Sequence, residues 1–259
     1  MQQAHGIAYT VTGPGDAPVL VLSNSLGTTV DMWTPQLDSL AKHCRVVRYD
    51  TRGHGASIAP DGEYTIDMLG RDVLAVLDAL DVERAHFCGI SMGGLTGQWL
   101  GVHAAERIDK LIVANTAARV GSLQGWADRA ALVRARGLDE VASGAAGRWF
   151  TPAFVQQQPE VVQRMTDQLR AIQSQGYAGC CDALSVADLR DEIEKIVAPT
   201  LVIAGLSDPV TTVDDARFIV ERVPGARMAT LDASHLSNIE AAQAFNSAVL
   251  AFLMQSDGE

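Results

Sequence analysis

The stretch Gly89-Ile90-Ser91-Met92-Gly93 gives the strongest indication of the fold of this chain. It follows a short apolar run at residues 86–90, which predicts a buried strand, and it precedes residues 94–102, which predict a helix. A serine between two glycines at such a junction is typical of a nucleophile elbow, a turn too tight for a Cβ two residues before or after the serine. The strand–turn–helix setting favours this interpretation over a chance glycine-rich turn. The turn would hold the Ser91 hydroxyl at a helix N-terminus, where backbone amides can stabilise an oxyanion.

Short apolar runs alternate with segments of helical period along most of the chain. Such alternation is typical of a parallel sheet covered by helices on both faces. Residues 66–80 and 241–254 space their apolar side chains three and four apart, which predicts amphipathic helices. We therefore expect an α/β fold with a mostly parallel central sheet. Besides 86–90, its strands are expected at residues 19–23, 45–49, 110–114, 200–204 and 227–231, with an opening strand near 5–11 at the sheet edge.

The alternation breaks between residues 118 and 193. This segment is rich in Ala, Gln and Arg, favours helix, and is followed by Pro199, which ends the helical run before the next strand. Core strands resume afterwards and must pair with earlier ones, so an insertion is favoured over a separate domain. The predicted organisation is a core of residues 1–117 and 194–259 with a helical cap, or lid, at residues 118–193.

Composition and charge narrow the functional classes. The 259 residues, 47% hydrophobic and 20% charged, suit one globular unit, and a net charge of −11 without a Lys/Arg cluster argues against a nucleic-acid partner. The first twenty residues do not read as a signal peptide, and no apolar run is long enough for a membrane span. The 4 cysteines form neither a CxxC pair nor a cluster with histidines. We expect a cytoplasmic protein with no metal site and no membrane partner; the sequence leaves the oligomeric state open.

His235 is the candidate base for Ser91. In this fold the acid and then the histidine follow the serine along the chain. Only His103 and His235 come after Ser91, and His103 lies one short helix beyond it and cannot turn back. A lone loop histidine is usually solvated, but His235 is expected at the carboxyl end of the sheet, where open α/β sites form.

Asp208 is the candidate acid because it directly follows the next-to-last strand. A carboxylate there can accept the Nδ1 proton of His235 and stabilise the imidazolium. Asp214 and Asp215 lie farther along and are expected to cap the next helix. Asp232 is too near His235 in the sequence to reach behind it.

The oxyanion hole is expected to combine the Met92 amide with an amide from the loop after residues 19–23. Leu26 is the candidate for this second donor, with Gly27 allowing the backbone to approach. Ser25 beside it is a candidate substrate contact or an ordinary turn residue. The stretch at residues 50–55 is interpreted as structural, His54 included.

Several stretches resemble the 3-oxoadipate enol-lactonases of the α/β-hydrolase superfamily. The resemblance spans nearly the whole chain, cap included. GxSxG and DxRGxG are superfamily-wide, whereas the others are more specific. The stretches are SNSLGTTVDMW (residues 23–33), RYDTRGHGAS (48–57), FCGISMGGL (87–95), NTAAR (115–119), RWF (148–150) and DASHLSNIE (232–240).

The resemblance implies an α/β-hydrolase fold and hydrolysis of a five-membered enol-lactone to 3-oxoadipate in the bacterial β-ketoadipate pathway of aromatic-acid breakdown. Ser91 would attack the lactone carbonyl, ring opening would release an enol, and water activated by His235 would free the acyl group. No metal or organic cofactor is implied.

The implied substrate is an anionic small molecule, so it needs a local cation. Arg148 is the first candidate, because guanidinium pairs with carboxylate through two parallel hydrogen bonds. Arg119, at the junction of core and cap, is the second; the alternative for both is a surface ion pair. Trp149 and Trp126 are candidate pocket walls, or they pack the cap.

The catalytic residues alone do not select the acyl substrate. A general carboxylesterase or a cofactor-free perhydrolase is therefore the alternative within the same fold. A dehalogenase is disfavoured because its nucleophile would be an aspartate. A non-catalytic binding protein is disfavoured because all the candidate catalytic residues and both elbow glycines are present.

Overall fold

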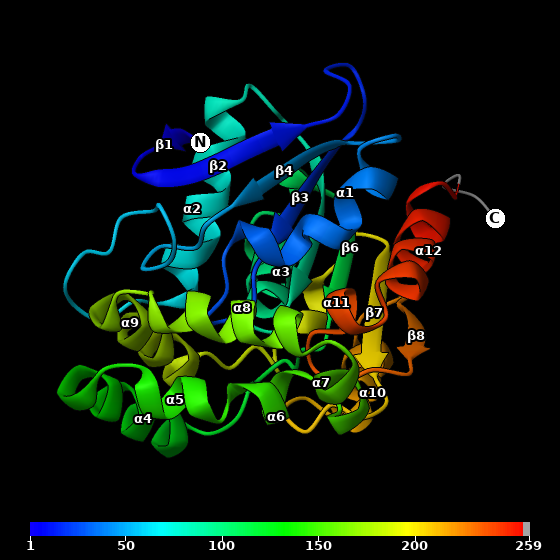
Figure 1. Cartoon of the computed structure of the whole chain (residues 1–259). Helices are drawn as coiled ribbons and strands as arrows, with labels where there is room; N and C mark the ends of the chain where they lie inside the picture. Colours follow the sequence, from blue (N-terminus) through cyan, green and yellow to red (C-terminus); the bar gives the residue numbers. More distant parts are fainter. Residues whose placement is uncertain (256–259) are drawn as a thin grey trace.

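An eight-stranded sheet forms the centre of the computed structural model, which describes residues 1–255 (Figure 1). The strand order is β1-β2-β4-β3-β5-β6-β7-β8. The pairs β1–β2 and β2–β4 are antiparallel and all other neighbours are parallel, so the predicted mostly parallel sheet is confirmed. The strands are β1 (Gln2–Ala4), β2 (Ile7–Thr12), β3 (Val19–Ser23), β4 (Arg45–Tyr49), β5 (Ala85–Ile90), β6 (Ile108–Ala114), β7 (Thr200–Gly205) and β8 (Arg227–Leu231).

The N-terminal region differs from the sequence prediction of one edge strand near residues 5–11. The structure has two strands there, joined by a turn in which His5 and Gly6 both have positive φ, 48° and 83°. Two consecutive positive φ values suit a tight hairpin between twisted strands. As a result β1 forms the edge of the sheet, and β2 pairs on both sides.

Helices cover both faces of the sheet, as predicted. On one face α3 packs on α2, and on the other α1 packs on α12 (Figure 1). The ring of Trp33 lies 6.1 Å from that of Phe245, which joins the start of α1 to α12 in the core. These helices are α1 (Thr34–Leu40), α2 (Ile66–Ala79), α3 (Met92–His103), α10 (Val213–Arg222), α11 (Ser237–Glu240) and α12 (Ala242–Leu253), with 3-10 helices at Val30–Trp33, Ala105–Arg107 and Ile193–Lys195.

The chain between β6 and β7 forms helices without a strand, and in Figure 1 these helices form a layer below the sheet. Within this layer α4 packs on α9, while α5, α6 and α7 each contact α8. The division into core and cap at residues 118 and 193 stays a prediction. The helices are α4 (Leu123–Arg136), α5 (Asp139–Ser143), α6 (Ala145–Trp149), α7 (Pro152–Gln157), α8 (Pro159–Arg170) and α9 (Ser174–Val186).

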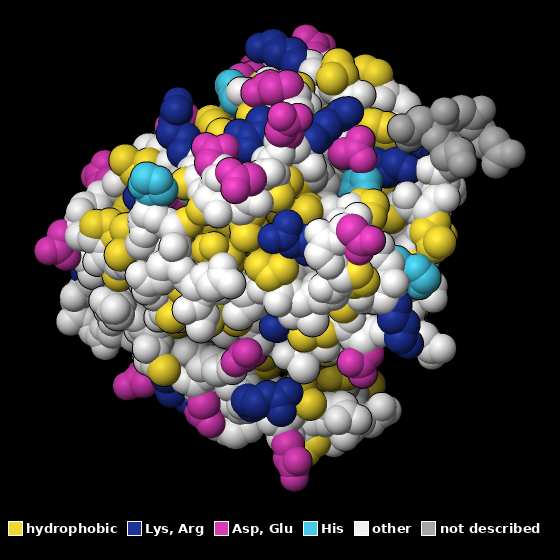
Figure 2. All heavy atoms as spheres, turned by 90° about the horizontal axis from the view of Figure 1, so that it is seen from above, with side chains coloured by type: hydrophobic (Ala, Val, Ile, Leu, Met, Phe, Trp, Pro, Cys, Tyr) yellow, Lys and Arg dark blue, Asp and Glu magenta, His cyan; other side chains and the backbone are white. Residues whose placement is uncertain are grey.

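The face opposite this helical layer carries charges of both signs. Figure 2 shows Lys and Arg side chains interspersed with Asp and Glu there, rather than gathered into one basic surface. Within residues 1–255, no helix is long and apolar enough to cross a membrane. The same residues contain no group of three or more His, Cys, Asp or Glu side chains arranged to hold a metal ion.

Candidate active site

Ser91 lies at the turn between β5 and α3 in a backbone conformation that few side chains adopt. Its φ is 57° and its ψ is −117°. A Cβ on Gly89 would lie 2.2 Å from the carbonyl oxygen of Gly93, and a Cβ on Gly93 would lie 2.3 Å from that of Ser23. Both elbow glycines are therefore required by close backbone approach.

His235 and Asp208 form a buried pair from the loops after β8 and β7. Nδ1 of His235 lies 2.8 Å from Oδ2 of Asp208, and the two side chains are 4% and 0% exposed. Burial raises the pKa of Asp208, but hydrogen bonds from His235, Asn115 and the Val210 amide outweigh it and hold the pKa below its usual value. An ionised Asp208 can only accept, so Nδ1 of His235 carries the proton and Nε2 is left as the basic nitrogen.

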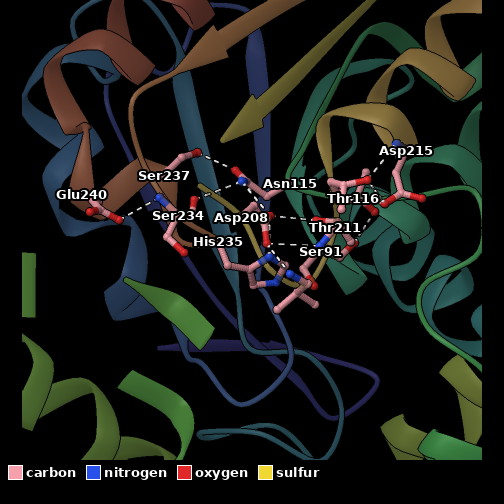
Figure 3. A network of polar contacts seen from close by, with 12 residues as sticks. Ser91, Asn115, Thr116, Asp208, Thr211, Asp215, Ser234, His235, Ser237 and Glu240 are labelled. Carbon is pink, nitrogen blue, oxygen red and sulfur yellow. Dashed lines mark hydrogen bonds and ion pairs between the residues drawn. The ribbon is translucent and has the colours of Figure 1, made fainter. Parts of the chain in front are cut away.

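The Ser91 and His235 side chains line the same cavity. Figure 3 shows Ser91 beside the His235 ring, with Asp208 on the ring's other side. The structure thus brings together the three residues that chain order singled out. The arrangement has the chemical elements of an activated serine: a hydroxyl, a basic nitrogen and a buried acid.

Asn115 and Thr116, which directly follow β6, hold all three of these residues in place. Asn115 Nδ2 donates to Asp208 Oδ2 at 3.0 Å and to the carbonyl oxygen of Ser234 at 3.1 Å. Thr116 Oγ1 donates to the Ser91 carbonyl oxygen at 2.7 Å. The sequence analysis did not assign either residue to the site. The available signal was their position after a core strand, at the carboxyl end of the sheet, where the loops that carry Asp208 and His235 also lie.

Residues 25–27 of the loop after β3 include one amide without a hydrogen bond to any described residue. The amides of Ser25 and Gly27 donate to a methionine sulfur and to Nε2 of His54, respectively. Between them, the Leu26 amide has no hydrogen-bond partner in the part of the chain that the structure describes. Met92 begins α3, so its amide has no intrahelical acceptor. These are the two donors that the sequence predicts, and their role stays a prediction.

His54 anchors this loop as a neutral hydrogen-bond acceptor. Its Nε2 accepts from the Gly27 amide at 3.0 Å, so Nδ1 carries the proton, and it faces the Arg52 carbonyl oxygen at 3.3 Å. The side chain is 1% exposed, and burial lowers its pKa to about 4. Gly27 has a φ of 82°, and a Cβ there would lie 2.8 Å from Leu169 Cδ1. The loop therefore lies between His54 and helix α8.

The cavity above Ser91 is small and is walled largely by the helices between β6 and β7. Its volume is about 40 Å³, well below the roughly 300–1,000 Å³ of pockets that hold small-molecule ligands. Four residues that the sequence predicts as binding residues, Ser25, Trp126, Arg148 and Trp149, line it. The complete lining is Ser25, Leu26, Ser91, Trp126, Arg129, Arg148, Trp149, Leu169, Tyr177, Val210 and His235.

Two arginines of the cavity wall have no carboxylate partner within residues 1–255. Arg148 donates to the Val141 carbonyl oxygen at 2.6 Å, and Arg129 lies over the Trp126 ring at 4.9 Å. Burial and the nearby charge of Arg129 lower the pKa of Arg148. By contrast, Arg134, also on α4, pairs with Asp182. The cavity wall thus holds two positive charges that no neighbouring carboxylate neutralises.

The structure does not bring Arg119 into this cavity. Arg119 pairs with Asp188 at 3.1 Å, and its side chain is 32% exposed. This is the surface ion pair that the sequence analysis held as the alternative. Arg129 is the second cation instead. Its signal in the sequence was its place three residues after Trp126, on the same helix face.

The rejected candidates have other partners or positions. His103 pairs with Glu192 at 3.3 Å. Asp215 forms a capping box with Thr212 at the start of α10, as predicted for this turn. Asp232 is exposed.

Comparison with known proteins shows which family the chain resembles. The family described as alpha/beta hydrolase fold matches residues 18–242. The chain is 51% identical to 3-oxoadipate enol-lactonase 2 of Acinetobacter baylyi, over 95% of this chain and 92% of that protein. It is 45% identical to 3-oxoadipate enol-lactonase 1 of the same organism, over 94% and 91%. The crystal structure of the enol-lactonase from Burkholderia xenovorans LB400 matches with a TM-score of 0.95 and 46% identity, over 97% of this chain and 98% of that chain.

Proposed function

The chain belongs to the alpha/beta hydrolase family and, within it, groups with the 3-oxoadipate enol-lactonases; from this premise we propose that it opens 3-oxoadipate enol-lactone to 3-oxoadipate in the β-ketoadipate pathway. The main support for the proposal is the charge of the cavity. The cavity that Ser91 and His235 line also contains two arginines without a carboxylate partner among the described residues. A nucleophile beside uncompensated positive charge suits an acyl substrate that carries its own carboxylate.

In the proposed first step, Ser91 Oγ attacks the lactone carbonyl carbon while Nε2 of His235 takes the hydroxyl proton. Asp208 stabilises the resulting imidazolium through Nδ1. The amides of Met92 and Leu26 stabilise the oxyanion, each by about 3–4 kcal/mol of transition-state free energy.

Collapse of the tetrahedral intermediate breaks the ring C–O bond, and His235 protonates the departing enol oxygen. The enol then relaxes to the ketone. An enol is a better leaving group than an ordinary alcohol, so acylation needs less assistance. A water molecule deprotonated by His235 attacks the acyl carbon, and Ser91 leaves with the proton. The sequence of steps consumes one water and needs no cofactor.

The substrate carboxylate is proposed to bind Arg148 and Arg129. A guanidinium can pair with a carboxylate through two parallel hydrogen bonds, and a protein of net charge −11 needs such local cations to hold an anion. Trp126 and Trp149 line the same cavity and are proposed to flank the lactone ring. Ser25, which also lines it, is a further candidate contact.

Residues 118–193 are proposed to act as a cap over a core formed by residues 1–117 and 194–259. The cavity of about 40 Å³ is too small for a six-carbon lactone, so the wall must move to admit substrate. Six of the lining residues come from α4, α6, α8 and α9, whereas Ser91, His235 and the other lining residues come from the core. We therefore propose that opening involves the cap rather than the catalytic loops.

Steady-state kinetics on the enol-lactone, with p-nitrophenyl acetate run alongside, test the proposed function. A kcat/KM above about 10⁴ M⁻¹s⁻¹ on the lactone, well above the value on the acetate, is expected. Equal or lower activity on the lactone would contradict the assignment. A general carboxylesterase would then describe the enzyme better.

A further inference from the structure

The loop that carries His235 is linked to the helical layer on both sides of the histidine, directly on one side and through Glu240 on the other. The amide of Leu236, the residue after His235, donates to the carbonyl oxygen of Trp149 at 3.0 Å. Trp149 is the last residue of α6 and lines the cavity. One side of the His235 loop is therefore attached directly to the cavity wall.

Glu240 makes the attachment on the other side. Its Oε2 accepts from the amide of Ser234, the residue before His235, at 2.8 Å, and Figure 3 shows the Glu240 side chain directed at Ser234. The same carboxylate accepts from the Thr151 amide at 3.2 Å and from the Thr151 hydroxyl. Glu240 thus joins the histidine loop to the turn between α6 and α7.

The segment held in this way also carries substrate-facing groups. Arg148 and Trp149 line the cavity and directly precede the turn, and Thr151 caps α7 by accepting from the Phe154 amide at 3.3 Å. Residues 148–151 therefore connect the cavity wall with the His235 loop. Glu240 itself does not line the cavity and has no contact with the candidate nucleophile.

We propose that Glu240 is a positioning residue for His235, which ties the histidine loop to the segment at residues 149–151 so that His235 is aligned with Ser91 only while that segment is docked. A carboxylate suits this task, because its two oxygens can accept from both sides at once, whereas a glutamine offers one oxygen acceptor. The inference rests on the proposed roles of Ser91 and His235, but not on the identity of the substrate.

The test measures how fast diethyl p-nitrophenyl phosphate modifies Ser91. In this reaction Ser91 Oγ attacks phosphorus, p-nitrophenolate leaves, and His235 takes the proton. The probe is neutral and carries no carboxylate, so its rate reports the alignment of the serine and histidine rather than the arginines. Rates are taken across the pH range in which histidine titrates, and thermal unfolding of each variant is followed in parallel.

The variants separate the Glu240 link from other contacts of the helical layer. Glu240→Gln and Thr151→Val should each slow labelling, Glu240→Gln by about tenfold or more, because small misplacements of a catalytic group are costly. Thr151→Ser keeps the hydroxyl and should label at the wild-type rate. Gln168→Ala removes another hydrogen bond between this layer and the core, Gln168 Nε2 to Asp31 at 3.0 Å, and should also leave the rate unchanged.

Labelling of Thr151→Val at the rate of Gln168→Ala would overturn the proposal, even where Glu240→Gln is too unstable to assay. Equal slowing in Thr151→Ser and Thr151→Val would overturn it as well, since the hydroxyl contact would not be responsible. A chain that fails to hydrolyse the lactone yet shows the expected labelling pattern would refute the proposed function and leave this inference standing.

Discussion

Asn115 links Asp208 to the loop that carries His235. It donates to Asp208 and to the Ser234 carbonyl oxygen, and its own Oδ1 accepts from Ser237 Oγ at 2.5 Å. It adopts a φ of 44°, which asparagine tolerates better than most residues. The same side chain thus connects the loops after β6, β7 and β8.

Asn115→Gly should lower kcat by about 10–100-fold with little change in KM, since a misplacement of about 1 Å at a catalytic group can cost about 100-fold. Glycine accepts the positive φ, so the effect reports the lost hydrogen bonds rather than backbone strain. Kinetics on the lactone and on p-nitrophenyl acetate should show the same loss. A KM effect confined to the lactone would argue against an orienting role.

His54 gives the fold an acid-sensitive contact. Its pKa in the folded state is about 4 because of burial, whereas an unfolded histidine titrates near about 6.5. Between these values the unfolded chain binds a proton that the folded chain does not. The stability that neutral His54 provides is therefore fully present above about pH 6.5 and is lost as the pH falls toward 4.

Replacing His54 with Gln should flatten this part of the pH profile of stability. The midpoint of urea unfolding would be followed for both proteins across the acid range. The free energy of unfolding of the wild type should fall more steeply below about pH 6.5. The extra slope should be at most that of one additional proton bound by the unfolded chain, about 1.4 kcal/mol per pH unit. Parallel profiles for the two proteins would show that His54 is not the titrating group.

At the scale of single residues, the sequence identified those whose position along the chain is fixed by the fold. Ser91, Asp208 and His235 follow core strands in a set order, and the elbow glycines mark the turn. Asn115 and Glu240 were missed because the hydrogen bonds from Asn115 to Asp208 and Ser234, and from Thr151 to Glu240, join segments about 90 residues or more apart. Local spacing gives no signal for such contacts.

Among the elements, α4 and α6 determine the charge of the cavity, since Arg129 lies on α4 and Arg148 on α6. Arg129→Ala and Arg148→Ala should each raise KM for the lactone by about tenfold or more, because a charge-assisted hydrogen bond contributes about 1.5–3 kcal/mol. Neither change should alter KM for p-nitrophenyl acetate, which has no carboxylate.

Arg119→Ala is the matched control for these variants. Arg119 pairs with Asp188 outside the cavity, and exposed pairs of this kind contribute little. Its KM for the lactone should match that of the wild type. If Arg119→Ala raised KM as much as Arg148→Ala, the lost charge would be acting at long range and the proposed carboxylate contacts would be wrong.

The strands were located well from the sequence, whether or not they are buried. The strands at 19–23, 45–49 and 227–231 have the expected bounds, although only one residue of β8 is buried, and the fully buried β5 and β7 are each one residue longer than predicted. Short runs between turn residues thus locate a strand, whereas its exact ends depend on hydrogen bonding along the sheet. The hairpin of β1 and β2 was missed because a two-residue turn at His5 and Gly6 splits a single short run. The spacing of apolar residues did not show where one helix between β6 and β7 ends and the next begins, because these helices bury apolar side chains against one another as well as against the core.

Across the whole molecule, the site combines residues from the loops of the sheet with residues from the helices inserted between β6 and β7. Ser91, Asp208 and His235 follow core strands, whereas the arginines and tryptophans of the wall lie between β6 and β7. The sequence predicted that these groups would meet and named Arg148, which lines the cavity, but it named Arg119 rather than Arg129 as the second cation. Arg119 lies in the loop before α4 and Arg129 on α4 itself, and only the packing of that helix brings Arg129 to the cavity.

The most direct test of this account is the kcat/KM of Ser91→Ala on 3-oxoadipate enol-lactone, measured beside the wild type. We expect a loss of about 10⁴-fold or more in a variant that unfolds at the wild-type temperature, because the hydroxyl is proposed to form the bond to the acyl group. A folded Ser91→Ala protein that retained turnover within about tenfold of the wild type would contradict it. The lactone would then be opened without the serine.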